Sequence, residues 1–249
     1  MSGRFQDQVI LISGAARGMG ASHARAFAAE GGRVVIADTR IDEAQNLAAE
    51  LGAAAMACLL DVRDFAQWES VVTLTAQKFG AVDVLVNNAG VLLYGAVTDE
   101  TPEQFRHIID INLTGVFLGM RAVIPGMRAR GRGAVINISS AAGLTAYPGS
   151  IGYAAAKWGV RGMSRAAAVD CAHTGVRVNC VFPGPTSTPM VDQTVDASFV
   201  QHQAIPRWSA PQEVSKVVLF LASGDASYCT GGEYAVDGGA SLGVVPAPR

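Results

Sequence analysis

A tyrosine and a lysine four residues apart, Tyr153 and Lys157 in Y-A-A-A-K, have the types and spacing of an acid/base pair. On a helix, residues i and i+4 lie one above the other on the same face. An ammonium beside a phenol favours the phenolate, so we expect the pKa of Tyr153 to fall from about 10 toward neutrality. A group that exchanges protons near neutral pH is what alcohol/carbonyl interconversion requires. Taken alone, the same spacing also occurs on ordinary solvated helix faces.

Two further features accompany this pair. Ser140 ends a strand-like run, residues 134–140, thirteen residues before the tyrosine. A glycine-rich segment with Gly14, Gly18 and Gly20 lies between the first predicted strand and the first predicted helix. Glycines there let the backbone approach a pyrophosphate, and the helix N-terminus presents free N–H groups to it. The spacing G-x-x-x-G-x-G in this context predicts a nucleotide-binding site.

Asp38 ends the second predicted strand, eighteen residues after Gly20. A carboxylate at this place can accept hydrogen bonds from ribose hydroxyls and repels a 2′-phosphate, which favours NAD over NADP. Arg17 and Arg40 oppose this interpretation, because either could approach a 2′-phosphate. A solvated aspartate at a strand end is the alternative.

Polar residues also end the third and fourth predicted strands. Asp61 and Val62 follow the third strand, where a carboxylate and a backbone N–H could bind the adenine edge. The run 87–90 follows the fourth strand and contains two adjacent asparagines. Buried amides need hydrogen-bond partners, so these asparagines are structural, cofactor-binding or both.

The elements that must position these residues alternate along the chain. Thr101 and Pro102 have the types of a helix cap and a first helical residue. Predicted strands occupy residues 9–12, 34–37, 55–60, 82–86, 135–138, 176–182 and 233–236, and predicted helices occupy 19–30, 44–51, 65–79, 101–130, 153–172 and 211–221. Continuous apolar strands alternating with helices predict a single α/β domain, a Rossmann-type doubly wound parallel sheet with helices on both faces. Its ligand should bind at the carboxyl edge.

We find no linker or repeat, so residues 1–249 are interpreted as one domain. The segment 188–208 is expected to be a mobile lid over the substrate. Its apolar residues could contact a hydrophobic substrate, or they could only pack the lid against the core. They are Val191, Val195, Phe199, Val200 and Ile205. Leu92, Leu93 and Tyr94 could complete that pocket. The tail 243–249 is either disordered or an arm on a neighbouring subunit.

Composition excludes several function classes. The net charge of −2 gives no electrostatic case for nucleic acid or an anionic membrane. No apolar run approaches the ~18 residues of a spanning helix, and the start of the chain is polar, so we expect a cytoplasmic protein. The four cysteines are widely spaced, which indicates free thiols, and the four histidines have no ligand spacing, so no metal site is expected.

These residues together resemble the short-chain dehydrogenase/reductase family over nearly the whole chain. The family pattern combines a T-G-x-x-x-G-x-G loop, N-N-A-G, a helical Asn, a Ser, Y-x-x-x-K and P-G. It is found here at Ser13 to Gly20, Asn87 to Gly90, Asn112, Ser140, Tyr153 to Lys157 and Pro183-Gly184. Ser13 replaces the usual Thr and keeps its hydroxyl. The stretches 13–20, 112–119, 139–144 and 157–162 are further similar to bacterial NAD-dependent 3α,20β-hydroxysteroid dehydrogenases.

The resemblance implies roles by position. Tyr153 would be the general acid/base, Lys157 would lower its pKa, Ser140 would hold the substrate oxygen, and Asn112 would anchor a water in a proton relay. A purely structural interpretation stays open for both Ser140 and Asn112. Ser140 could be a serine that only ends a strand, and Asn112 a polar residue that only caps a helical irregularity. The implied NAD-binding residues are Gly14, Arg17, Gly18, Met19, Gly20, Asp38, Asp61, Val62, Asn88, Ala89, Gly90, Tyr153, Lys157, Pro183, Gly184, Thr186 and Thr188.

The resemblance therefore implies an NAD-dependent enzyme that transfers a hydride between the nicotinamide and a hydrophobic or cyclic alcohol or ketone, working as a homotetramer. One rival is a 3-oxoacyl-thioester reductase, whose acidic carrier protein could dock on arginines at 121, 128, 130, 132, 161 and 165. Another is a nucleotide-sensing regulator that kept the fold without the chemistry. Such regulators typically lose the tyrosine or the lysine, and both are present here.

Overall fold

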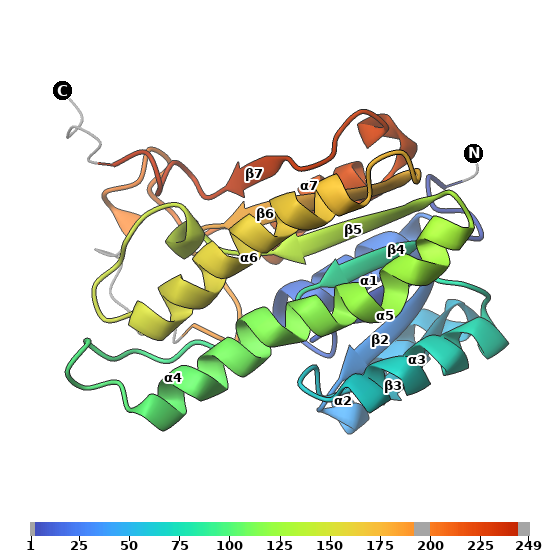
Figure 1. The fold of residues 1–249 in the computed structure, drawn as a ribbon, viewed down its shortest axis with the longest axis horizontal. Coiled ribbons are helices and arrows are strands. Elements are labelled where there is room, and N and C mark those ends of the chain that lie inside the picture. Colours follow the sequence, from blue (N-terminus) through green and yellow to red (C-terminus); the bar gives the residue numbers. More distant parts are fainter. Residues whose placement is uncertain (1–2, 192–199, 244–249) are drawn as a thin grey trace.

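The computed structural model describes residues 3–191 and 200–243. Within them, one all-parallel seven-stranded sheet has the order β3-β2-β1-β4-β5-β6-β7 (Figure 1). The strands are β1 (Val9–Ser13), β2 (Arg33–Asp38), β3 (Ala55–Leu59), β4 (Val84–Asn87), β5 (Gly133–Ile138), β6 (Val176–Pro183) and β7 (Glu233–Val236). The predicted doubly wound α/β sheet is confirmed.

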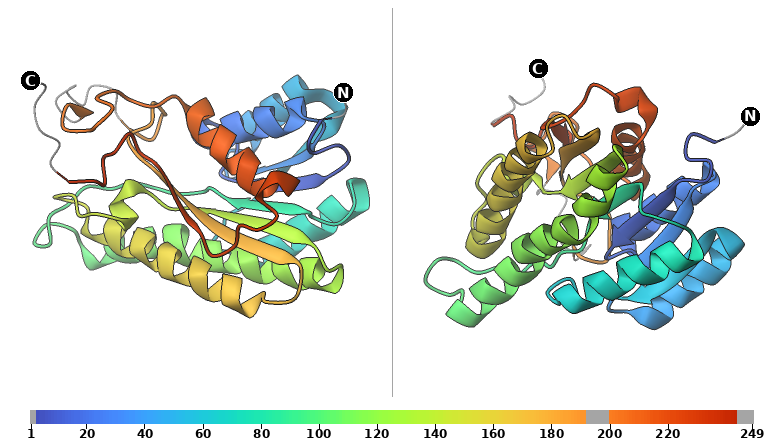
Figure 2. Two further views of the ribbon diagram at one scale, coloured as in Figure 1. Left: turned by 90° about the horizontal axis from the view of Figure 1, so that it is seen from above. Right: turned by 45° about the vertical axis from the view of Figure 1, so that its right-hand side comes forward.

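Helices cover both faces of this sheet (Figure 2). One face carries α1 (Gly18–Ala29), α2 (Ile41–Leu51) and α7 (Pro211–Ala222). The other carries α3 (Phe65–Lys78), α4 (Pro102–Ile109), α5 (Gly115–Ala129) and α6 (Ile151–Asp170). Short 3-10 turns, η1 (Gly52–Ala54), η3 (Ala141–Gly143) and η5 (Gly224–Ala226), were not expected from the sequence.

Successive residues of β1 show how the sheet divides the core. Ile10 and Ile12 pack in a cluster with Phe27 of α1. Leu11, between them, packs with Val116 of α5 in a second cluster on the opposite face. All of these side chains are buried. Because strand side chains alternate between faces, a strand buried on both sides must be mostly apolar, as β1 is from Val9 to Ile12.

The chain order leaves a crevice at the carboxyl edge of the sheet. β1 pairs in parallel with β2 on one side and with β4 on the other. The chain runs outward from β1 to β3 and then crosses back to β4. The segments that follow β1 and β4 therefore diverge, which is where ligands bind in open α/β sheets.

A long helical segment runs diagonally across the front of the sheet in Figure 1, and it starts as the sequence predicts. Thr101 and Gln104 form a reciprocal capping box, with Pro102 at the first position. α4 passes into a π-helical segment, η2 (Asp110–Thr114), and then into α5. The stretch Pro102–Ala129 is long and apolar enough by composition to span a membrane, and it contains an 18-residue window of mean hydropathy 1.4, of which 39% is buried. Here the stretch packs against α3 and α6, and that packing accounts for its buried apolar side chains, such as Ile108 and Val116.

The predicted lid is described only in part. Residues 192–199, which include Val195 and Phe199, lie outside the described residues, as does the tail from 244. Val200 is buried, and the Ile205 N–H donates to the Gly238 carbonyl at 2.8 Å. The mobility of this segment stays a prediction.

Candidate active site

The glycine loop joins β1 to α1 and lies at the crevice. Gly14 and Gly18 have φ of 62° and 57°, in the left-handed region that other residues rarely adopt. A Cβ on Gly20 would lie 2.2 Å from the Gly14 carbonyl oxygen, so only glycine fits. Arg17, at the N-cap of α1, makes no side-chain capping bond. The first N–H groups of α1 are therefore available to an anion.

The asparagines after β4 fasten this loop to the sheet. The Asn88 side chain donates to the carbonyls of Ser13 and Gly14, at 3.1 and 2.9 Å. The Ser13 hydroxyl accepts from the backbone N–H groups of Asn88 and Ala89. Asn87 donates to Asn137 on β5 at 2.9 Å. The structural role expected for the pair is thus confirmed, and the buried Oδ1 of Asn88 has no protein hydrogen-bond partner.

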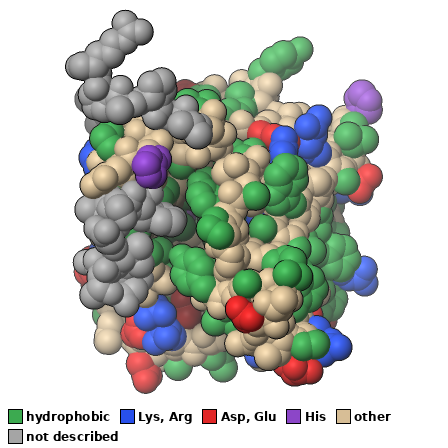
Figure 3. All heavy atoms as spheres, turned by 90° about the vertical axis from the view of Figure 1, so that its left-hand side faces the viewer, with side chains coloured by type: hydrophobic (Ala, Val, Ile, Leu, Met, Phe, Trp, Pro, Cys, Tyr) green, Lys and Arg blue, Asp and Glu red, His purple; other side chains and the backbone are tan. Residues whose placement is uncertain are grey.

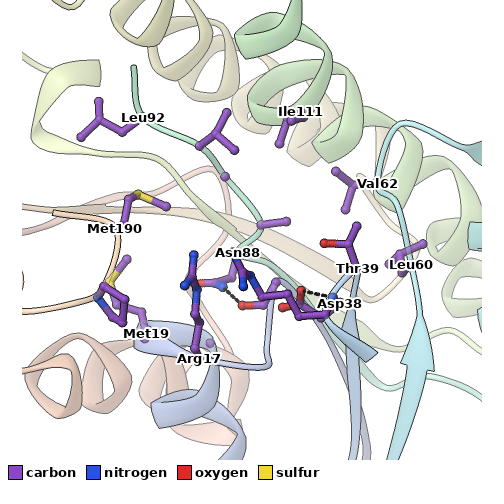
Figure 4. Close-up of a pocket in the computed structure, with 18 of the residues that line it drawn as sticks. Arg17, Met19, Asp38, Thr39, Leu60, Val62, Asn88, Leu92, Ile111 and Met190 are labelled. Atoms are coloured by element: carbon purple, nitrogen blue, oxygen red, sulfur yellow. Dashed lines mark hydrogen bonds between the residues drawn. The ribbon is translucent and has the colours of Figure 1, made fainter. Parts of the chain in front are cut away.

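A cavity of about 600 Å³, the larger cavity, opens above the loop (Figure 4). Twelve of the predicted cofactor residues line it: Gly14, Arg17, Gly18, Met19, Gly20, Asp38, Asp61, Val62, Asn88, Ala89, Gly90 and Thr188. The sequence analysis missed Thr39, Leu60, His107 and Ile111, which also line it. Thr39 and Leu60 are adjacent to predicted residues, whereas nothing in the sequence singles out the two on the long helical segment.

Two carboxylates in the larger cavity differ in what holds them. Asp38 is 8% exposed and accepts from the backbone N–H groups of Ala16 and Arg40, both at 3.0 Å. Asp61 instead binds the Arg63 guanidinium, with one N–O distance of 2.6 Å. That hydrogen bond holds the pKa of Asp61 below its usual range. Asp38 is therefore fixed by backbone alone, and Asp61 is neutralised by its neighbour.

The two arginines that opposed the choice of NAD are not equivalent. Arg40 pairs with Glu43 at 3.0 Å. Arg17 lines the larger cavity and extends into it in Figure 4. Within the described part of the chain, Arg17 has no ion pair. Both arginines line the larger cavity, and Arg17 is the one of the two that has no carboxylate partner among the described residues.

A second cavity of about 170 Å³, the smaller cavity, lies beside the first. Seven predicted residues line it: Met19, Ser140, Tyr153, Pro183, Gly184, Thr186 and Thr188. Ser140 comes from the end of β5 and Tyr153 from the first turn of α6, so two separate elements bring the hydroxyl and the phenol together. Tyr147 also lines this cavity and was not predicted, whereas Met190 and Trp208, which line it too, lie in the predicted segment 188–208.

Lys157 lies behind the tyrosine rather than in either cavity. It is 3% exposed, and its Nζ donates to the Ile138 carbonyl at 3.0 Å. The ammonium lies 5.6 Å from the centre of the Tyr153 ring. Burial lowers the pKa of Lys157 to about 8.

The prediction that the pKa of Tyr153 falls is wrong for the protein without its cofactor. Burial raises the pKa of this phenol, and a hydrogen bond with Ser140 opposes the rise only in part. The reason is that the half-buried ring loses more solvation than Lys157 restores, since that ammonium is bonded to Ile138 instead.

Asn112 lies in the π-helical segment and is fully buried. Its side chain donates to the Val91 carbonyl at 2.9 Å and accepts from the Val91 N–H at 3.0 Å. A Cβ on Gly90 would lie 2.7 Å from the Asn112 Oδ1 and 3.8 Å from the Lys157 Nζ. Asn112 therefore holds the segment after β4 against the lysine, and it lines neither cavity.

The segment after β6 completes the edge. The Thr186 hydroxyl lies 2.9 Å from the Ser209 hydroxyl and donates to the Gly184 carbonyl at 3.0 Å. Thr186 and Thr188 are buried, and Thr188 lines both cavities. This segment thus forms the boundary between the two cavities.

These residues fit a dinucleotide. The larger cavity has the volume expected for such a ligand. The uncapped N-terminus of α1 suits a pyrophosphate, and the buried Asn88 Oδ1 offers an unused acceptor. No three His, Cys, Asp or Glu residues gather as metal ligands in residues 3–191 and 200–243.

Known proteins match this chain over almost its whole length. A family model described as enoyl-(acyl carrier protein) reductase matches residues 14–241. The 3-alpha-(or 20-beta)-hydroxysteroid dehydrogenase of Mycobacterium bovis is 46% identical over 98% of this chain and 93% of that protein. The trans-4-hydroxycyclohexanecarboxylate dehydrogenase of Sinomonas cyclohexanicum is 45% identical, covering 98% and 96%. A solved 3-ketoacyl-(acyl-carrier-protein) reductase from Brucella melitensis, complexed with NADH, has TM-score 0.92 and 32% identity, covering 95% and 99%.

Proposed function

Because the chain belongs to the short-chain dehydrogenase/reductase family, we propose that it is an NAD-dependent oxidoreductase acting on a hydrophobic, cyclic secondary alcohol or its ketone. The reaction converts an alcohol and NAD⁺ to a ketone, NADH and a proton. One observation carries the proposal. The cavity with Ser140 and Tyr153 adjoins the larger cavity, and the two share Met19, Leu92, Thr188 and Met190. When bound, the nicotinamide supplies the hydride acceptor or donor.

Tyr153 is the general acid/base in this proposal. Because burial raises its pKa, the protein alone keeps the phenol protonated at neutral pH, which suits donation of a proton to a ketone oxygen. Ser140 donates a second hydrogen bond to the same oxygen and stabilises its developing negative charge. In the reverse direction the Tyr153 phenolate takes the alcohol proton, favoured by the nearby Lys157 cation.

Asn112 and Lys157 lie behind Tyr153 and position the groups around it. The Ile138 carbonyl holds the Lys157 ammonium. Asn112 holds Val91, and its Oδ1 lies against Gly90, which borders the ammonium. The π-helical geometry at Asn112 departs from the regular helical bond pattern, which frees backbone groups to hold a water. We assign Asn112 to that proton path as a positioning residue.

The cofactor is a nicotinamide dinucleotide, as in the family, and we favour NAD over NADP. Asp38 is held at the end of β2 by two backbone N–H groups, so its carboxylate cannot swing away from a 2′-phosphate. Arg40 is occupied by Glu43. Arg17 is left for the pyrophosphate at the N-terminus of α1, where a dinucleotide always carries negative charge.

The rival activity, a 3-oxoacyl-thioester reductase, is favoured only by the similarity to the Brucella melitensis enzyme. Its basic dock is weakened in this structure. Arg130 and Arg132 pair with Asp83, while Arg161 and Arg165 pair with Glu233. Four of the six candidate arginines therefore share two carboxylates, which halves their combined charge from +4 to +2.

We also propose a cytoplasmic homotetramer. Exposed apolar side chains on α5 and α6 support subunit pairing: Phe117 is 46% exposed, Trp158 is 47% exposed and Val169 is 75% exposed. Such surface is unfavourable in water unless another chain covers it. Sedimentation at several protein concentrations tests this assignment.

The function is tested by following nicotinamide absorbance with a panel of cyclic and acyclic ketones, supplying NADH or NADPH. We expect turnover of cyclic ketones with NADH and little with NADPH. Turnover of 3-oxoacyl thioesters alone, together with capture by acyl carrier protein, would establish the rival activity. Binding of NADH without turnover of any substrate would contradict both.

A further inference from the structure

The smaller cavity is small for a molecule of several rings. Its volume is about 170 Å³. Sites that enclose drug-sized ligands have volumes of roughly 300–1,000 Å³. At the ~30 Å³ that a water molecule occupies in the liquid, the smaller cavity corresponds to about six waters. That is space for one six-membered ring with its oxygen.

The polar groups of the smaller cavity are concentrated at one place. Three lining hydroxyls already donate to backbone carbonyls: Ser139 to Lys157, Ser150 to Tyr147 and Thr186 to Gly184. Ser140 accepts from the Ala142 N–H and shares a hydrogen bond with Tyr153. A substrate oxygen can join these two hydroxyls. The rest of the lining is mostly apolar apart from the polar atoms of Tyr94, Tyr147 and Trp208.

No charged side chain lines the smaller cavity among residues 3–191 and 200–243. The face of the molecule at the carboxyl edge shows hydrophobic side chains over its centre and charged ones mostly near its periphery (Figure 3). A carboxylate or phosphate on the substrate would lose its hydration here without gaining a cation. The cavity therefore selects against charged substrates.

Backbone hydrogen bonds fasten the segment that carries Trp208. Trp208 lies beside Ser209, whose N–H donates to Pro185 and whose carbonyl accepts from Ser187, both at 2.9 Å. These bonds hold the backbone next to the indole against the segment after β6, and Trp208 lines the smaller cavity. Tyr94 is 65% exposed and Met190 is 41% exposed, and both also line this cavity. A larger substrate would thus have to displace the indole or extend past Tyr94 and Met190 into water.

We propose that the substrate is an uncharged, single-ring secondary alcohol or its ketone, and that Trp208 sets this size limit. This inference rests on the proposed function and narrows it. A tetracyclic steroid satisfies the proposed function as well as cyclohexanol does, so the size limit is a separate statement. It makes Trp208 a specificity-determining residue that contacts the far side of the substrate ring.

The test keeps the reacting ring constant and adds fused rings. Cyclohexanone, 2-decalone and 5α-androstan-3-one are compared by kcat/KM with NADH, and 4-oxocyclohexanecarboxylate tests the effect of charge. We expect kcat/KM to fall roughly a hundredfold from cyclohexanone to the steroid, the scale at which apolar pockets discriminate size. The carboxylate should fall below cyclohexanone by about tenfold or more.

Substitution of Trp208 tests whether this residue sets the size limit. Trp208→Ala should raise the ratio of kcat/KM for 2-decalone over cyclohexanone by about tenfold. Tyr228→Ala, which removes a fully exposed aromatic ring that lines neither cavity, should leave that ratio as in the wild type. An unchanged ratio in a folded Trp208→Ala protein would overturn the role of Trp208.

The wild-type series stands without any variant. If the steroid is reduced as efficiently as cyclohexanone, the size inference is wrong while the proposed function stands. If efficiency with 4-oxocyclohexanecarboxylate matches that with cyclohexanone, the charge inference is wrong. If NADH binds but no ketone is reduced, the proposed function itself fails, and the size limit fails with it.

Discussion

The two cavities at the carboxyl edge are built in different ways. Most residues of the larger cavity lie in the segments that directly follow β1, β2, β3 and β4, and Asn88 and Ser13 fasten the first of these segments. The smaller cavity is formed by residues from five separate regions, near residues 19, 92–94, 139–153, 183–191 and 208. The cofactor side is therefore fixed by the sheet, whereas the alcohol side depends on how distant segments pack.

Apart from Tyr153→Phe, the largest expected difference between the two sides comes from Ser140→Ala. This substitution removes one of two hydrogen-bond donors to the substrate oxygen and touches nothing in the larger cavity. We expect kcat to fall about 100- to 1,000-fold, as for other donors to a developing oxyanion. Titration of NADH by fluorescence should give an unchanged Kd. A large rise in the NADH Kd would show that the two sides are not separable.

The next largest effect concerns Lys157, which lies behind both cavities. It is an effect on the free energy of unfolding. Burial lowers its pKa to about 8 from the usual 10.5, so the unfolded chain binds more protons between these values. The free energy of unfolding should therefore rise as the pH increases across this window. Below pH 8 the buried lysine is charged in the folded protein, and the full cost of burying the ammonium lowers stability. Relative to Lys157→Met, the wild type should gain about 3 kcal/mol, which corresponds to the pKa difference.

Urea unfolding of both proteins at pH 7.5, 9 and 10.5 measures this gain. The comparison with Lys157→Met removes the contributions of other groups that titrate in the same range. If the two stabilities run parallel with pH, Lys157 is not buried as the structure describes.

The smallest effect is expected from Asp38→Ala on the cofactor side. Without this carboxylate a 2′-phosphate is no longer repelled, so the preference for NADH over NADPH in kcat/KM should shrink about tenfold, or ~1.4 kcal/mol. The relative efficiencies for different ketones should not change. Asp42→Asn, an exposed carboxylate on α2, is the matched control. A constant cofactor ratio in Asp38→Ala would contradict the assigned role.

The sequence predicted the residues of the larger cavity better than those of the smaller cavity, because the two cavities are built in different ways. Glycine spacing, Asp38 and the asparagines follow strands directly, so a parallel sheet brings them to one edge wherever the rest of the chain goes. Tyr147 could not be found, and Trp208 was predicted only as part of the segment 188–208, because the places of both depend on the packing of irregular segments. The i, i+4 rule correctly placed Tyr153 and Lys157 on α6.

The same rule gave the wrong direction for the pKa of Tyr153. Spacing reports proximity but says nothing of burial, and burial raises that pKa. It also could not show that Lys157 is bonded to the Ile138 carbonyl. Charge interactions inside a protein thus depend on solvation that the sequence pattern does not contain.

The assignment of Tyr153 as the proton donor and acceptor is tested most directly by Tyr153→Phe, with turnover and NADH binding measured on the same preparation. The ring fills the same space in the variant, so packing is preserved while the exchangeable proton is lost. We predict that kcat falls about a thousandfold or more and that the NADH Kd stays within about threefold of the wild type. Retention of wild-type turnover in this variant would contradict the account.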